Sequence, residues 1–75
     1  MRLYFFDVFA DDRLTIDDDG MHLPGIKRVE EEAVRTLAEM VRDKARESRD
    51  YQMVVKLRDL TGPLFQVQCT FVRKP

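Results

Sequence analysis

Residues 26–47 read IKRVEEEAVRTLAEMVRDKARE, and in this stretch the apolar residues recur at helical spacing. One side of a helix with about 3.6 residues per turn collects Val29, Ala33, Leu37, Met40, Val41 and Ala45, with Val34 and Ala38 widening the stripe. Charged side chains occupy the opposite side. A single amphipathic helix cannot bury its stripe alone, so the flanking segments must supply the surface that it covers.

The sequence on both sides of this helix alternates between apolar and polar residues over short runs, as half-buried strands do. Turn-forming clusters separate the runs at residues 11–13, 17–20 and 59–63. Strands are expected at residues 2–9, 14–16, 51–58 and 64–72, with brief further pairing at residues 21–23. The pattern predicts a two-layer α+β fold, in which one long helix packs on one face of an antiparallel sheet of three to four strands, in the order β-β-α-β-β. Because no repeat or linker interrupts the chain, we expect residues 1–75 to form a single domain.

The alternation assigns each strand residue to one face of the sheet. Asp7 would be costly to bury without a partner, so the face that carries Tyr4 is assigned to the helix. The helix-facing set is Tyr4, Phe6, Val8, Met53, Val55, Leu57, Phe65, Val67, Cys69 and Phe71. The opposite face carries Asp7, Lys56, Arg58, Gln66 and Gln68, together with the apolar residues Leu3, Phe5, Phe9, Val54 and Leu64.

The composition fits one small folded domain with a thin core. The 75 residues are 44% hydrophobic and carry a formal net charge of -1, which does not favour nucleic acid or an anionic membrane as a partner. Cys69 is the single cysteine, so no intrachain disulfide can form. The opening apolar run is too short for a signal or membrane-spanning segment. We therefore expect a cytoplasmic protein.

Several of these features occur together in a known family. They are the opening Tyr4-Phe5-Phe6, the acidic turn from Asp17 to Gly20, Leu23 before a helix rich in Glu, Arg and Ala, and Asp59 and Gly62 before a closing strand that contains Phe. Over nearly the whole chain this set resembles a family of short alphaproteobacterial proteins known only as a domain of unknown function. The resemblance implies the same small α+β fold and no established activity. In that family a histidine often follows the two phenylalanines; this chain has Asp7 there, so no role of that histidine is carried over.

The acidic turns are the strongest candidates for metal binding. Their carboxylates belong to Asp11, Asp12, Asp17, Asp18 and Asp19. Asp17, Asp19 and Gly20 match the middle of a calcium-binding loop of the helix-loop-helix type, but Ile26 stands where that loop places its bidentate Glu. We interpret the cluster as ordinary acidic turns, because Asp and Gly are good turn formers.

No pattern points to catalysis. His22 is the single histidine, and its place between two apolar residues predicts a solvent-facing position on a strand without a nearby nucleophile. Cys69 lies on the inward alternation and is expected to be a small core residue. We therefore predict a protein that is not an enzyme, with no catalytic residue, metal ligand, cofactor or small-molecule substrate.

The apolar residues on the face that the helix leaves uncovered are the most informative feature for function. They are Leu3, Phe5, Phe9, Val54 and Leu64, and such patches often mark partner surfaces. Asp7 is expected to pair with Lys56 or Arg58 beside them. The structural alternative is that a loop or the final residues fold across the patch.

This patch predicts a non-catalytic interaction module that forms a homodimer or another homo-oligomer, or binds another protein. The contact would use the uncovered sheet face or an edge strand. The alternative is a regulatory or antitoxin-like module that binds a protein toxin or nucleic acid, on fold-level analogy alone.

Overall fold

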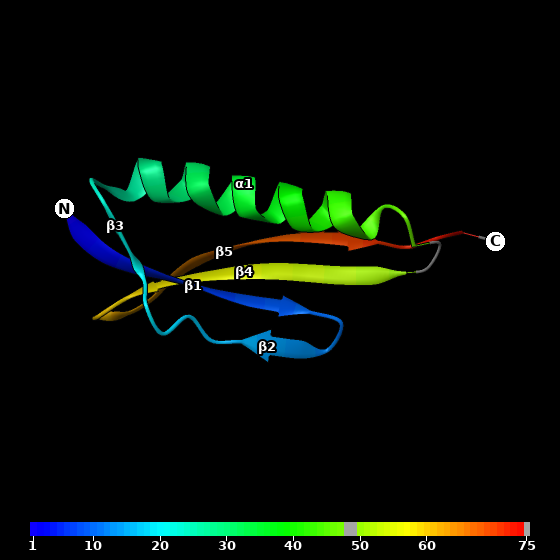
Figure 1. Ribbon diagram of the computed structural model, residues 1–75, viewed down its shortest axis with the longest axis horizontal. Coiled ribbons are helices and arrows are strands. Elements are labelled where there is room, and N and C mark those ends of the chain that lie inside the picture. The colour runs from blue at the N-terminus through cyan, green and yellow to red at the C-terminus, as the bar shows by residue number, and fades with distance from the viewer. Residues whose placement is uncertain (48–49, 75) are drawn as a thin grey trace.

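The computed structural model describes residues 1–47 and 50–74, in which one helix covers one face of an antiparallel sheet (Figure 1). The elements are β1 (Arg2–Ala10), β2 (Arg13–Thr15), β3 (Met21–Leu23), α1 (Ile26–Lys44), β4 (Tyr51–Asp59) and β5 (Gly62–Phe71). The two-layer α+β fold is confirmed. Within the described residues the sheet is 5-stranded rather than three- to four-stranded, because the segment before the helix pairs with β1 in two separate places.

The strand order is β2-β1-β4-β5, with β3 also paired to β1. β1 and β4 are therefore central, and β5 forms one edge of the sheet. The turn from β1 to β2 consists of Asp11 and Asp12, whose φ angles are 54° and 61°. Positive φ at both positions is typical of a type I′ hairpin turn, whose twist matches that of the strands it joins.

The other edge of the sheet is interrupted by a bulge. β3 pairs with residues 2–4 of β1 and β2 pairs with residues 8–10, so residues 16–20 lie opposite only residues 5–7. Five residues cannot form a regular ladder with three. The edge beside β1 therefore consists of two short strands with an irregular segment between them.

The core lies between α1 and the sheet and confirms the predicted face assignment. Its buried members are Tyr4, Leu23, Val29, Ala33, Val55 and Leu57, and Phe6, Val8, Leu37, Met40, Phe65 and Val67 pack against them. Val29, Val55 and Leu57 are almost completely buried. Removing each of these side chains from water stabilises the fold by about 1.5–3 kcal/mol.

The helix is shorter, and its buried stripe narrower, than the sequence predicts. α1 ends at Lys44 rather than near residue 47, and Val34 and Ala38 are exposed although they were expected to widen the stripe. Val29 and Ala33 are buried. The helix meets the sheet along one narrow line, and a residue one position further along the chain is rotated about 100° away from that line.

The C-terminal end of α1 is tied to the β1–β2 turn. Lys44 Nζ lies 2.5 Å from Asp11 Oδ2 and 2.8 Å from Glu47 Oε2. Hydrogen bonds to Asp11 and then to Glu47 raise the pKa of Lys44 above its usual value. A cation in the last turn also suits the negative end of the helix dipole.

Candidate interaction site

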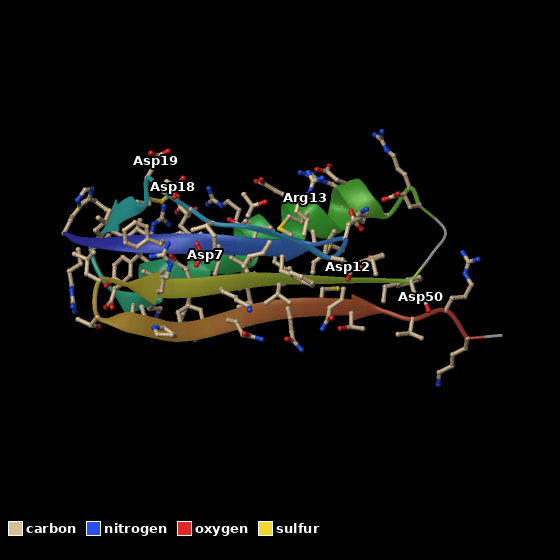
Figure 2. All side chains as sticks on the ribbon, turned by 90° about the horizontal axis from the view of Figure 1, so that it is seen from below. Asp7, Asp12, Arg13, Asp18, Asp19 and Asp50 are labelled. Carbon is tan, nitrogen blue, oxygen red and sulfur yellow. The ribbon has the colours of Figure 1, made fainter. Side chains whose placement is uncertain are left out.

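The outer face, meaning the sheet face opposite α1, carries a partly buried ion pair between Asp7 and Arg58. Asp7 on β1 lies on this face, which Figure 2 presents to the viewer. Arg58 Nε donates a hydrogen bond to Asp7 Oδ2 at 2.8 Å, and Arg58 Nη2 donates to Asp7 Oδ1 at 3.3 Å. Asp7 is only 7% exposed, and a buried carboxylate requires such a partner. The expected pairing of Asp7 is confirmed with Arg58, while Lys56 beside it is exposed.

Asp17 connects this ion pair to the bulge. Its backbone N–H donates to Asp7 Oδ1 at 2.8 Å, and its carbonyl oxygen accepts from Arg58 Nη2 at 3.0 Å. Its carboxylate accepts backbone N–H bonds from Phe6 at 3.0 Å, Asp19 at 3.1 Å and Gly20 at 3.0 Å. The Phe6 N–H would otherwise lose its ladder partner at the bulge. The side chain of Asp17 therefore replaces the missing strand bond.

Both carboxylates have a pKa below the ordinary value of 3.8. The hydrogen bond from Arg58 is the main reason that the pKa of Asp7 is lowered, and burial opposes it. For Asp17 burial is the largest single influence and raises the pKa, but the combined hydrogen bonds from Gly20, Phe6 and Asp19 outweigh it. Both groups are therefore charged at neutral pH, as their hydrogen bonds require.

The bulge and Arg58 cover part of the predicted apolar patch. The guanidinium carbon of Arg58 lies 4.3 Å from the centre of the Phe5 ring, a cation–π arrangement. Gly20 also packs against this ring: a Cβ built on it would lie 3.0 Å from Phe5 Cε1 and 2.8 Å from Leu3 Cδ1. As a result Phe5 is only 8% exposed although it does not face the helix. The alternative that a loop folds across the patch is therefore correct for Leu3 and Phe5.

The remaining candidate residues differ in accessibility. Val54 is buried, Phe9 is partly buried, and Leu64 is exposed at an irregularity in β5. The sequence interpretation missed Leu14, which pairs directly with Phe9 and is 48% exposed. Directly paired residues share a face, so Leu14 belongs to the outer face. The two-residue turn before β2 was the signal that could have placed it there.

The two edges of the sheet differ in their protection against strand pairing. The β2/β3 edge is split into strands of 3 residues each and carries the bulge. β5 has 10 residues, GPLFQVQCTF, and none of them is charged. Long edge strands are usually protected by charges, bulges or short length, because their free backbone groups can pair with another chain.

The directions of the backbone groups on β5 follow from the hydrogen bond of Phe6. Its N–H points toward the β2/β3 edge, so the odd-numbered residues of β1 present their N–H and C=O groups to β4. The odd-numbered residues of β1 pair with even-numbered residues of β4, so the odd-numbered residues of β4 present their backbone groups to β5. Val55 pairs with Val67, so the backbone N–H and C=O of Val67 point toward β4. Gln66, Gln68 and Thr70 therefore direct their backbone N–H and C=O groups away from the sheet.

Other residues considered for chemistry are separated in the fold. His22 is exposed on β3 opposite Leu3, as expected, and Cys69 is partly buried opposite Met53 on the helix-facing side. Among residues 1–47 and 50–74, no three His, Cys, Asp or Glu side chains are arranged to hold a metal ion. Asp12 and Asp50, both labelled in Figure 2, border a hollow of about 250 Å³ at one end of the sheet.

A model of the family described as Domain of unknown function (DUF6894) matches residues 3–70. The chain belongs to this family. The expected resemblance to a family of unknown function is thereby confirmed. No curated protein and no solved structure matches the chain.

The matched range of the DUF6894 domain contains all the contacts described for the outer face. Position 7, where the resemblance described above implies a histidine in other members, holds in this chain an aspartate bonded to Arg58 and to the backbone of Asp17. In the part of the chain that the structure describes, no helix is both long and apolar enough to cross a membrane.

Proposed function

We propose that this DUF6894 domain is a non-catalytic interaction module that self-associates through the free edge of β5. The observation that carries the proposal is the uncharged ten-residue edge strand. At alternate residues its backbone groups have no strand beside them among residues 1–47 and 50–74. Adding a strand to such an edge satisfies those groups and extends the sheet.

The opposite edge is a poor site for this kind of pairing. Asp17 occupies the gap between β2 and β3 and already accepts the Phe6 N–H. A partner strand would meet two short segments in different registers, separated by the bulge. One edge is therefore protected and the other is available.

The outer face is the other candidate surface for self-association. The contacts on it make it a less suitable surface than the β5 edge. Arg58 and Gly20 cover Phe5, so one of the two phenylalanine rings of the patch is already packed within the same chain. Lys56 is exposed in the middle strands of the same face. A partner packing flat against this face would have to desolvate that charge, while the carboxylate of Asp7 directly opposite it is already bonded to Arg58.

Sedimentation velocity over a concentration series tests the proposal, with two single substitutions compared with the native chain. Gln68→Lys places a charge on the free edge, and Leu14→Glu places one on the outer face; both sites are exposed, so the monomer should fold in each case. We expect the native chain and Leu14→Glu to be dimers, and Gln68→Lys to be a monomer. A native chain that stays monomeric at all concentrations contradicts self-association, and a dimer lost only in Leu14→Glu contradicts the choice of edge.

A further inference from the structure

We infer that the occupant of the β5 edge is a second copy of the same strand, paired antiparallel about a twofold axis that passes through Gln68. This inference rests on the proposed self-association and specifies its geometry. The assembled sheet would have the order β2-β1-β4-β5-β5′-β4′-β1′-β2′, where primes mark the second copy.

The regular part of β5 determines where the axis lies. Leu57 pairs with Phe65 but Arg58 pairs with Pro63, so Leu64 is an extra residue that bends the strand. Regular pairing therefore begins at Phe65 and continues to Phe71, where β5 ends. An antiparallel pair of these seven residues, FQVQCTF, is complete when its centre lies at Gln68.

The backbone groups agree with this register. Gln66, Gln68 and Thr70 direct their N–H and C=O groups away from β4, as derived above from the Phe6 bond. With the axis at Gln68, Gln68 faces its own copy and Gln66 faces Thr70 of the other copy. Each of these pairs has outward-pointing backbone groups on both sides, so about six backbone hydrogen bonds can form.

The side chains are also self-complementary in this register. On the outer face Gln68 meets Gln68 of the second copy, and each amide can both donate and accept. On the helix-facing side Val67 meets Cys69, and Phe65 meets Phe71. Directly opposite residues in an antiparallel pair share a face, so polar side chains meet polar ones and apolar meet apolar along the whole strand.

Phe71 gains most from this contact. It is 43% exposed, and one face of its ring stacks on Tyr51 with centroids 5.3 Å apart. The Phe65 ring of the second copy would arrive beside it, and aromatic pairs across strands stabilise a sheet. β5 itself carries no charge, so its own side chains add no like-charge repulsion to the approach of two copies.

Disulfide trapping with single cysteines tests the register. In a Cys69→Ser background, Gln68→Cys places two cysteines directly opposite each other across the axis, with Cα atoms about 5.5 Å apart, within the range of a disulfide. Gln66→Cys is the matched control, since it changes the same residue type on the same exposed face. Its two copies would lie four residues apart along the strand, about 13 Å, which is too far to cross-link.

Under mild oxidation we expect most of the Gln68→Cys protein to migrate at twice the monomer mass on a non-reducing gel, and the Gln66→Cys protein to remain at the monomer mass. A native chain that sediments as a dimer while Gln66→Cys cross-links, or while neither variant does, overturns the register but leaves self-association in place. A native chain that never dimerises overturns both.

Discussion

Replacing Gly20 by alanine should destabilise the domain more than the same change at Gly62. Both glycines have a positive φ, 75° at Gly20 and 134° at Gly62. A residue with a Cβ in such a conformation destabilises the folded state by about 1–2 kcal/mol. The surroundings differ. A Cβ at Gly20 would lie 2.8 Å from Leu3 Cδ1 and 3.0 Å from the backbone oxygen of Tyr4. At Gly62, apart from its two chain neighbours, no atom of the described residues would lie within 4 Å of such a Cβ.

The second contribution at Gly20 comes from overpacking. The Leu3 methyl can rotate away, but the Tyr4 carbonyl belongs to a paired strand and can move little, so we add about 1 kcal/mol for the displaced backbone. Gly20→Ala should therefore lower the free energy of unfolding by about 2–3 kcal/mol, and Gly62→Ala should lower it by about 1–2 kcal/mol. For a chain of 75 residues with a total stability of about 4–11 kcal/mol, the first loss is a large fraction.

Urea unfolding followed by circular dichroism measures both values, at one protein concentration for all variants because association adds to apparent stability. Gly62→Ala serves as the control for the backbone contribution alone. Equal losses at the two positions, or a smaller loss at Gly20, would refute the reasoning that the bulge is packed against β1.

Two further predictions concern the outer face and the first turn. The folded-state pKa of Asp7 is lowered, so its contribution to stability is present above the unfolded value of about 3.9 and is lost as pH falls through the folded pKa. The urea midpoint should therefore drop between pH 5 and about pH 2, and Asp7→Asn should flatten that drop; parallel profiles for the two proteins would contradict the assignment. Asp12 has a φ of 61° in a two-residue turn, so Asp12→Gly should stabilise the domain by about 0.5 kcal/mol, and a loss of stability in thermal unfolding would contradict the type I′ assignment.

The positions of the helix and strands could be predicted because each follows from hydrophobic periodicity. The 3.6-residue repeat placed α1, and the alternation around Tyr4, Val55 and Val67 placed their side chains in the core. The strand order could not be predicted, because alternation says which face a residue occupies and not which strand lies beside it. The two-part pairing of β1 is the clearest example.

The burial of the outer-face residues was harder to predict than which residues lie on that face. Sequence pattern placed Phe5 on that face, but its burial depends on Arg58, which is 51 residues beyond Asp7, and on the loop that Asp17 holds. Asp17 looks like one of several acidic turn residues. What distinguishes Asp17 is that its carboxylate accepts the Phe6 N–H, a contact that forms only when two separate segments of the chain meet. Residue type and local spacing therefore cannot predict it.

The contrast between the two sheet edges bears on the size of the assembly. If β5 pairs with β5 of a second copy, the backbone groups of both uncharged edges are hydrogen-bonded to each other. Each end of the extended sheet is then a β2/β3 edge. That edge is short and bulged, and the Asp17 carboxylate occupies part of it. When two copies pair through one edge each and both remaining edges are protected, the assembly stops at two copies. If each chain had two open edges, further copies could add without limit. The Asp7–Arg58–Asp17 contacts therefore have a role in the proposed dimer although they lie far from its axis: by holding the bulge in place, they keep the second edge unsuitable for pairing.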